Sequence, residues 1–362
     1  MSVKLTHNSF ILKLTKWEFW PIWLSYLPIV PVFLYYVLRS RRFFFFSNVN
    51  PSLKTGAFLG ASKFQILNQI PDEFTPISIL SKKGVNRYQY AIEEITKYQL
   101  SYPVIVKPDV GERGLLVELI KDQSELKDYL SANDIDIIIQ EYIDLPEECG
   151  IFYIRKPSQI HGEIVSIGLK SFLSIKGDGI STLEELMNLD PRAKLQVKRF
   201  QNDQPKFLNK IFEKDAVVNL EPIGNHNRGT TFIDGNYLRN EQLNVLFDKI
   251  NSSMKDVYYG RFDIKYKDWE SLLKGKDLKI LEMNGVASEP IHVYDEKVPM
   301  HEKYKSFFSL WKSIYEISII QKARGYEPMA SIAAVKTIRD YYKYVRSINL
   351  NWRKPKPSTS LT

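Results

Sequence analysis

The chain has 362 residues, of which 44% are hydrophobic and 25% charged, and its formal net charge at pH 7 is +8. This composition allows one large or two moderate hydrophobic cores and, outside the N-terminal segment, is that of an ordinary soluble protein. No nucleic-acid-binding motif accompanies the modest positive charge, so we expect anionic lipid or an anionic substrate rather than nucleic acid as the partner. The single cysteine, Cys149, excludes an internal disulfide and is consistent with a reducing compartment.

The N-terminal region carries an uncharged, aromatic-rich segment at residues 19–38, FWPIWLSYLPIVPVFLYYVL, followed by Arg39, Arg41 and Arg42. Its length is roughly enough to cross a bilayer core, and no small-residue cleavage site of a signal peptide follows it. Its three prolines argue against a straight spanning helix, and its tryptophans and tyrosines are typical of the headgroup region. The segment therefore predicts a broken helix or shallow re-entrant hairpin on the cytoplasmic leaflet. A buried core helix with an aromatic seam is the alternative.

The rest of the chain alternates strand and helix patterns. A strand-like FFFF run closes the N-terminal segment, Asp122 is expected to cap a helix, and Ser181 with Glu184 forms an S/T-x-x-E capping box. A basic tail at 352–357 is expected to be disordered. Strands are predicted at 43–46 and 76–80, and helices at 63–68, 88–99, 123–130, 181–187, 240–256 and from His301 onward.

A glycine-containing loop follows the buried-strand pattern of residues 101–107, which ends in Lys107. In residues 109–117, Gly111 and Gly114 allow a tight bend that brings backbone N–H groups against phosphate oxygens. Arg113 adds a charged guanidinium group that can also bind phosphate. A single Gly-x-x-Gly loop is most often an ordinary hairpin turn. The strand lysine before the loop makes the phosphate-binding interpretation more specific.

Two further strand patterns, residues 261–264 and 278–283, are joined by a charged segment and are expected to pair as a hairpin. Asp263 then lies beside Glu282 and Asn284, which gives an all-oxygen ligand set. Such a set suits Mg²⁺, which keeps waters and phosphate oxygens as its other ligands. A hairpin with three solvated polar residues is the alternative.

The order of these pieces across residues 55–290 resembles the ATP-grasp superfamily, and within it the D-alanine–D-alanine ligase-like and cyanophycin-synthetase-like carboxylate–amine ligases. The resemblance implies an α+β fold in which two α+β subdomains clasp ATP, here with an N-terminal hydrophobic membrane-associated segment and a C-terminal helical tail. The G-D-G…S-T-L-x-E-L stretch at 177–186 favours the cyanophycin-synthetase branch over a kinase. Leu116 stands where many relatives carry a further glycine. The chain before Lys63 is expected to be too short for the substrate-binding domain with which relatives begin.

The resemblance also implies the roles of individual residues. Metal ligands would be Asp263, Glu282 and Asn284, and catalytic residues would be Arg261, for the transition state, and Lys170, for phosphate. Glu148 would bind ribose, with Glu147 competing for that role. The remaining nucleotide-binding residues would be Lys63, Lys107, Gly111, Arg113, Gly114, Glu141, Tyr142 and Ile143.

The polar stretch 223–230 contains His226, Asn227 and Arg228. We predict that these three residues bind a carboxylate substrate or an acyl phosphate, because arginine is the preferred bidentate partner of both groups. The alternative is a polar turn.

The expected activity, implied by the resemblance, is an ATP- and Mg²⁺- (or Mn²⁺-) dependent ligase that activates a carboxylate as an acyl phosphate for attack by an amine. Its substrates would be small-molecule or lipid-linked, and it would work on the cytoplasmic face of the cell membrane, or in the cytoplasm. An ATP-grasp phosphotransferase and a membrane-tethered nucleotide-binding protein without turnover are the alternatives. The expected organisation is a membrane-associated segment at 1–46, the first part of the ATP-grasp fold at 47–100, the nucleotide and metal domain at 101–295, and a helical region with a basic tail at 296–362.

Overall fold

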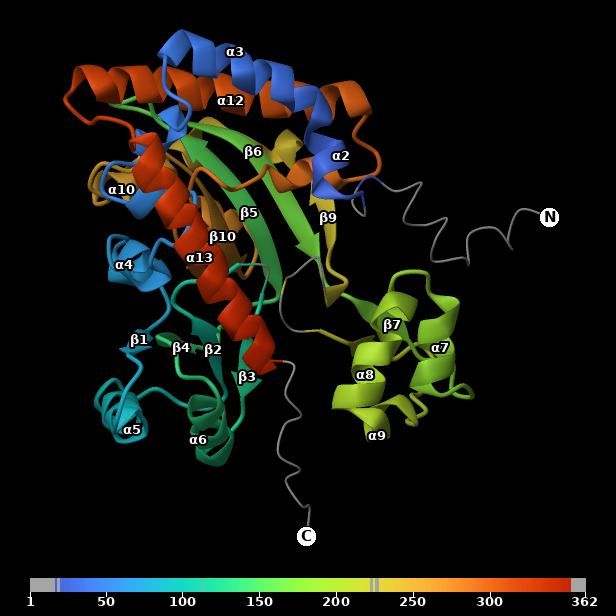
Figure 1. Ribbon diagram of the computed structural model, residues 1–362. Coiled ribbons are helices and arrows are strands. Elements are labelled where there is room, and N and C mark those ends of the chain that lie inside the picture. Colours follow the sequence, from blue (N-terminus) through green and yellow to red (C-terminus); the bar gives the residue numbers. More distant parts are fainter. Residues whose placement is uncertain (1–16, 18–19, 113, 222–223, 225–227, 353–362) are drawn as a thin grey trace.

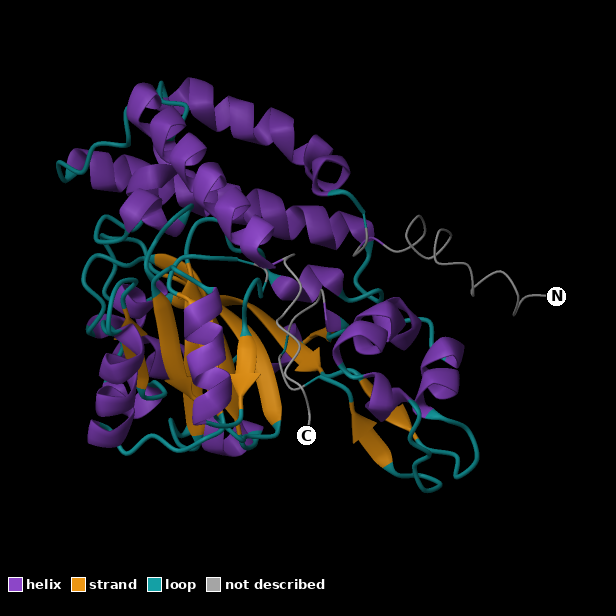
Figure 2. Cartoon of the chain, turned by 60° about the horizontal axis from the view of Figure 1, so that its bottom comes forward, coloured by secondary structure: helices purple, strands orange, loops and turns teal. Residues whose placement is uncertain are grey.

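The computed structural model describes residues 17, 20–112, 114–221, 224 and 228–352 (Figure 1). These residues form a four-stranded sheet, a five-stranded sheet and a small two-stranded sheet, and every pairing between neighbouring strands is antiparallel. Helices pack around the sheets (Figure 2). The predicted α+β class is confirmed.

The four-stranded sheet has the order β1-β4-β2-β3 and is covered by two amphipathic helices. Apolar residues of these helices, including Ala91 and Leu126, pack with Val104 and Ile139 of the sheet. Asp122 caps the second helix by accepting a hydrogen bond from the Glu125 N–H at 2.9 Å, as predicted. The elements are β1 (Ser78–Ser81), β2 (Val104–Pro108), β3 (Glu118–Ile120), β4 (Ile137–Glu141), α5 (Arg87–Lys97) and α6 (Gln123–Ala132).

The five-stranded sheet has the order β11-β10-β5-β6-β9 and buries side chains on both faces. Along β5, Cys149, Ile151 and Tyr153 join the core beneath α10, whereas Phe152 and Ile154 join a second core beneath α12. This alternation follows from the two-residue period of a strand. The predicted pairing of the Asp263 and Glu282 strands is confirmed. The elements are β5 (Glu147–Ile154), β6 (Glu163–Ser171), β9 (Thr231–Asp234), β10 (Tyr259–Tyr266), β11 (Leu278–Asn284), α4 (Lys63–Leu67), α10 (Glu241–Ser252) and α11 (Trp269–Leu273).

A small lobe between β6 and β9 has its own apolar core, which includes Leu183, Met187 and Phe200 (Figure 1). The predicted helix at 181–187 is present, but its capping box is formed by Thr182 and Glu185, one residue later than predicted. The lobe consists of β7 (Ser174–Lys176), β8 (Val217–Asn219), α7 (Leu183–Leu189), α8 (Val197–Asp203) and α9 (Pro205–Leu208).

The N-terminal segment forms a broken helix along α12 (Met300–Ala323), and residues 20–40 form no re-entrant hairpin (Figure 1). Pro21 precedes its first helical piece, and Pro28 and Pro31 fall in the first turns of the next two, where a missing N–H costs little. The pieces are α2 (Ile22–Tyr26), the 3₁₀ turn η2 (Leu27–Ile29) and α3 (Val30–Ser40). In the part of the chain that the structure describes, no helix is both long and apolar enough to cross a bilayer.

The prediction of a strand at 43–46 is wrong. Phe45 begins a 3₁₀ turn, and the rings of Phe45 and Phe46 are buried against α3 and α12. The Phe33 ring lies 5.1 Å from that of Trp311 in the same cluster. Four consecutive aromatic residues fit a turn here because rings from two neighbouring helices surround it. The 3₁₀ turns are η3 (Phe45–Asn48), η4 (Lys54–Ala57), η5 (Asp72–Phe74), η6 (Ala193–Gln196), η8 (Asn236–Leu238) and η9 (Ile291–Tyr294).

The last helix, α13 (Ser331–Trp352), runs from the end of α12 past the glycine-containing loop (Figure 1). Its Tyr344 hydroxyl donates a hydrogen bond to the Val110 carbonyl at 3.1 Å. The predicted helical C-terminal region is thereby confirmed. The expectation of a disordered tail concerns residues that, after Trp352, lie outside the described part.

Candidate active site

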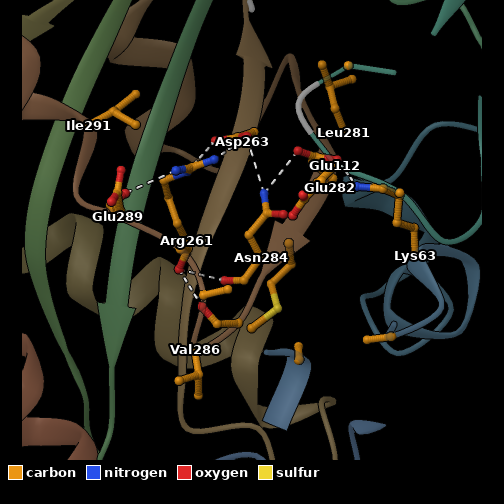
Figure 3. A pocket seen from close by; sticks show the side chains of 18 of the residues that line it. Lys63, Glu112, Arg261, Asp263, Leu281, Glu282, Asn284, Val286, Glu289 and Ile291 are labelled. Carbon is orange, nitrogen blue, oxygen red and sulfur yellow. Dashed lines mark hydrogen bonds and ion pairs between the residues drawn. The ribbon is translucent and has the colours of Figure 1, made fainter. Parts of the chain in front are cut away.

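Strand register brings the predicted metal and transition-state residues onto one face of the five-stranded sheet. Asp263 lies opposite Glu282, and Arg261 lies opposite Asn284, across the β10–β11 pair. In the same sheet, Glu148 on β5 lies opposite Lys170 on β6. Residues far apart in sequence therefore meet in one cluster (Figure 3).

Arg261 and Asp263 form a bidentate ion pair. The Arg261 Nε and Nη2 groups donate to the two Asp263 carboxylate oxygens at 2.9 and 3.0 Å. The remaining Nη1 donates to the Glu289 main-chain carbonyl at 3.0 Å, which fixes the plane of the guanidinium. Gly150 lies opposite Asp263, and a Cβ there would come within 2.8 Å of Ile291 and 3.2 Å of Asp263 Oδ1. Only glycine leaves room for this pair.

The other two predicted metal ligands are linked to each other and to Lys63. The Asn284 side-chain amide donates to Glu282 at 3.0 Å, and the Lys63 Nζ donates to the second Glu282 oxygen at 2.7 Å. Among the described residues, no group of three or more His, Cys, Asp and Glu side chains is placed to hold a metal ion. Two carboxylates and one amide oxygen nevertheless fit Mg²⁺, which takes hard oxygen donors and keeps the rest of its shell as water or phosphate.

Lys107 is buried at the centre of the cluster. Its Nζ donates to Gln140 Oε1 at 2.9 Å and to the Leu281 carbonyl at 3.0 Å. Burial lowers the pKa of Lys107 to about 8, although Glu282 opposes the effect. A buried ammonium without a full counter-charge is a strong candidate to receive an anionic ligand.

Lys170 is also buried and lies between two carboxylates. Its Nζ donates to Glu148 at 2.6 Å and lies 3.7 Å from Asp263. Burial alone would lower the pKa of Lys170, but the two acids outweigh burial and raise it. Lys170 therefore stays charged beside the metal-ligand cluster. Glu148 is 4% exposed and paired with this lysine, whereas Glu147 is exposed, and the ribose-binding role of Glu148 stays a prediction.

The glycine-containing loop is held to the start of α4. The Asp109 carboxylate accepts hydrogen bonds from the Ser62 hydroxyl and the Phe64 N–H, both at 2.9 Å. These contacts place Lys63, at the first turn of α4, beside the loop. Two loop residues have a positive φ, Gly114 at +70° and Leu116 at +57°. Leu116 therefore has the left-handed backbone conformation that glycine adopts most easily. By the family resemblance, many relatives carry a glycine at this position. Arg113 lies outside the described residues.

The predicted hinge residues Glu141, Tyr142 and Ile143 line the same cavity as Lys63 and Lys107. The Glu141 carboxylate accepts a hydrogen bond from the Ile77 N–H at 3.1 Å, and the Glu141 N–H donates to the Ile77 carbonyl at 2.8 Å. The Glu141 side chain is thus engaged in fixing the hinge to the chain before β1.

Of the predicted substrate residues, His226 and Asn227 lie outside the described part. Arg228 is described, and its guanidinium donates to Glu221 at 3.3 Å and to the Val117 carbonyl at 2.7 Å. Arg228 is not among the residues that line the cavity. Its contacts tie the chain before β9 to the end of the glycine-containing loop, and its substrate-binding role stays a prediction.

The cavity has a volume of about 960 Å³ and extends beyond the charged cluster. Its second part is walled by aromatic residues of the N-terminal segment and of α12, which sequence reasoning did not connect with the site. Lys265, two residues after Asp263 on β10, also lines the cavity, and the strand period of two could have identified it. The sequence-missed residues that line or shape the site include Gln140, Lys265, Glu289, Tyr294, Tyr26 and Trp311.

Comparisons with known proteins found one matching family model and several similar proteins. Residues 62–168 match the family model described as RimK-like ATP-grasp domain. Over 104 residues the chain is 31% identical to the coenzyme gamma-F420-2:alpha-L-glutamate ligase of Methanocaldococcus jannaschii, a stretch that covers 26% of this chain and 35% of that ligase. The match thus spans about a third of the length of this curated relative.

Solved structures with similarity to the chain include two ligases. The VanG D-Ala:D-Ser ligase of Enterococcus faecalis is 12% identical, with 73% of this chain and 62% of that chain covered and a TM-score of 0.40. A D-alanine–D-alanine ligase of Bacillus anthracis is 17% identical, with 73% and 69% covered and a TM-score of 0.41. The family-model match and the curated relative therefore agree on one point: residues 62–168 are similar to a RimK-like ATP-grasp domain.

Proposed function

We propose that this protein is an ATP- and Mg²⁺-dependent carboxylate–amine ligase that forms an amide bond and releases ADP and phosphate. The main support for the proposal is that four cationic side chains and three oxygen-donor side chains line a single cavity. The cations are Lys63, Lys107, Lys170 and Arg261, and the oxygen donors are Asp263, Glu282 and Asn284. A cavity that gathers four cations around an oxygen-donor set suits the phosphates of a nucleotide and a developing phosphoryl charge. The curated relative is by name a ligase, which supports the same class of reaction.

Each cation has a distinct position in this scheme. Lys63 and Lys107 lie on the nucleotide side and would hold the phosphates, exchanging their contacts with Glu282 and Gln140 for phosphate oxygens. Lys170 and Arg261 lie on the side of Asp263 and would stabilise the transferring phosphoryl group and the tetrahedral intermediate. Mg²⁺ held by Asp263, Glu282 and Asn284 would neutralise charge on the phosphates.

The glycine-containing loop would close over the phosphates and keep water from the acyl phosphate. In support, the loop is fixed at its start, where Asp109 binds Ser62 and Phe64, and near its end, where Arg228 donates to the Val117 carbonyl. Closure would then require the residues around Gly111 and Gly114 to move between these two fixed points.

The test is ATP turnover with mixtures of candidate carboxylates and amines, including extracts of metabolites and membrane lipids. The ligase proposal expects ADP and free phosphate in equal amounts, together with a new mass equal to the sum of the two substrates minus water. ADP with a phosphorylated product and no free phosphate would instead indicate a phosphotransferase. The absence of any turnover with every mixture would favour a nucleotide-binding protein.

We further propose that the N-terminal helices hold the enzyme on the anionic cytoplasmic face of a membrane, where ATP is available. Five exposed apolar residues recur at helical spacing on the outer side of α2, η2 and α3: Trp23 (68% exposed), Leu27 (59%), Val30 (45%), Leu34 (46%) and Leu38 (78%). We call this set the apolar stripe. Arg39, Arg41 and Arg42 follow it directly, and a stripe of this kind beside basic residues suits an anionic lipid surface. Because Tyr26 on the same helices lines the cavity, a lipid-linked substrate could be presented there.

A further inference from the structure

The aromatic part of the cavity lies next to Arg261 and is formed by segments from both ends of the chain. Trp17, Trp20 and Tyr26 come from the N-terminal segment, and Phe307 and Trp311 come from α12. The rings pack on one another: Trp17 lies 5.6 Å from Trp20, and Tyr26 lies 5.7 Å from Phe307. Trp17 is 8% exposed, and its indole N–H has no hydrogen-bond partner within the described part of the chain.

One carboxylate, that of Glu289, belongs to this aromatic part. Its Oε1 accepts a hydrogen bond from the Tyr26 hydroxyl, and its Oε2 accepts one from the Tyr294 hydroxyl. Glu289 is half-buried and lines the cavity. The close phenol contact and burial raise the pKa of Tyr26, burial being the larger cause, so this hydroxyl keeps its proton and acts as a donor. The carboxylate is therefore held in one orientation.

The charge of Glu289 is not neutralised by an ion pair. Of the other acids that line the cavity, three have a cation within 4 Å: Asp263 has Arg261, Glu282 has Lys63, and Glu148 has Lys170. Glu289 forms no such pair with a described Lys, Arg or His. A carboxylate has about four acceptor positions, and the two phenols occupy two of them. Glu289 thus retains acceptor capacity toward the cavity, and no described cation forms an ion pair with its carboxylate.

We propose that Glu289 binds a primary ammonium group of a substrate whose apolar or aromatic body lies against the surrounding rings. Aromatic faces and a carboxylate together favour an organic cation over a neutral or anionic group. A substrate carboxylate is disfavoured at this point by Glu289 itself and would lie instead on the side of Lys170 and Arg261. This inference rests on the proposed ligase function and narrows its substrate class to a hydrophobic amine or amino acid.

The position of Glu289 places the ammonium group near the reacting atoms. The main-chain carbonyl of Glu289 accepts a hydrogen bond from Arg261 Nη1 at 3.0 Å, and Arg261 also binds Asp263. Glu289, Arg261 and Asp263 also line the same cavity, so the bound amine and the proposed phosphoryl site would share one cavity. If the amine is the attacking nucleophile, its ammonium form must first give up a proton, and the Glu289 carboxylate is the acceptor beside it. If the amine is a second group on the carboxylate substrate, it stays protonated.

The test compares three probes of similar shape: 2-phenylethylammonium, 2-phenylethanol and 3-phenylpropanoate. Binding is measured by calorimetry on the full-length protein with Mg²⁺ and a non-hydrolysable ATP analogue. We expect only the ammonium probe to bind measurably. Glu289→Gln should weaken its binding about 10- to 100-fold, as expected when a charge-assisted contact is lost, with affinity for the ATP analogue unchanged. The matched control is Glu316→Gln, because Glu316 is partly exposed and pairs with Lys156 at 2.8 Å outside the cavity.

Equal binding of the alcohol and the ammonium probe to the unaltered protein would overturn the assignment, and this result needs no variant to fold. Retention of ammonium binding by folded Glu289→Gln would also overturn it. If the ammonium probe binds selectively but no ATP turnover is found with any substrate mixture, the ligase proposal fails and the Glu289 site stands. An amide product that contains the probe would support the site and identify the bound amine as the nucleophile.

Discussion

Lys107 separates nucleotide binding from stability, because removal of its charge should weaken nucleotide binding strongly and change stability little. The substitution is Lys107→Met, which keeps the length of the apolar stem and removes the terminal ammonium group. A charge-assisted contact with a phosphate contributes about 1.5–3 kcal/mol, so affinity for ATP should fall about 10- to 100-fold.

Stability should change little, or rise, in the protein without nucleotide. A pKa of about 8 in place of 10.5 corresponds to on the order of 3 kcal/mol against the charged form at neutral pH, and Lys107→Met relieves that cost. Against this gain, the Gln140 Oε1 atom and the Leu281 carbonyl lose a donor, at about 1–3 kcal/mol if water does not replace it. The two effects are of similar size, so the free energy of unfolding should shift by no more than about 2 kcal/mol.

The pH dependence follows from the same pKa. Since the pKa of Lys107 is lower in the folded protein than in the unfolded chain, the unfolded chain binds more protons between about pH 8 and 10.5. Stability should therefore gain a contribution as pH rises through this window, and Lys107→Met should remove it. Urea unfolding at pH 7.5 and pH 10, with ATP affinity from calorimetry, measures all three quantities. Unchanged ATP affinity, or a loss of stability far above 3 kcal/mol at neutral pH, would refute this reasoning.

Three other predictions concern the metal ligands, a buried histidine and the membrane surface. Asp263→Asn or Glu282→Gln should reduce ATP turnover to background while far-ultraviolet circular dichroism stays unchanged, and near-normal turnover by both variants would remove the metal assignment. Burial lowers the pKa of His292 to about 4, so the free energy of unfolding should fall by up to about 3 kcal/mol as the pH drops from 6.5 to 4. In urea unfolding, His292→Gln should flatten this pH dependence. The same pH dependence in the variant and the unaltered protein would contradict the prediction. The double substitution Leu27→Glu and Leu34→Glu should weaken binding to phosphatidylserine vesicles by more than about tenfold. The control Ile160→Glu alters a residue that is 83% exposed and lies outside the apolar stripe, and it should leave vesicle binding unchanged. Equal binding by all forms would rule out the apolar stripe as a lipid contact.

The charged half of the site could be predicted from the sequence because strand periodicity and pairing determine it. Asp263 and Glu282 lie in two neighbouring strand patterns joined by a short connection, so antiparallel pairing brings them opposite each other. Lys107 follows from the buried-strand pattern that ends at it, whereas the roles of Lys63 and Lys170 follow only from the family resemblance; all three lysines line the cavity. Local patterns also identified the Asp122 cap and the helix that follows Thr182.

The aromatic half could not be predicted, because it depends on contacts between segments far apart in the chain. Tyr26 and Glu289 are separated by 263 positions and meet only because α2 packs beside α12. The same packing explains the wrong strand at 43–46, where the side chains of Phe44, Phe45 and Phe46 are buried in a cluster with residues of α3 and α12. From the sequence, the broken N-terminal helix can be interpreted either as a membrane segment or as a core helix. In the structure, the inner side of this helix contributes to the core, and its outer side exposes the apolar stripe.

The most direct test of the ligase proposal follows the carboxylate oxygen. When a substrate pair has been found by mass spectrometry, the carboxylate is labelled with ¹⁸O and the released phosphate is analysed. Activation as an acyl phosphate predicts that each phosphate carries one ¹⁸O atom from the substrate, with ADP and amide formed in equal amounts. Unlabelled phosphate, or release of AMP and pyrophosphate in place of ADP, would contradict the account.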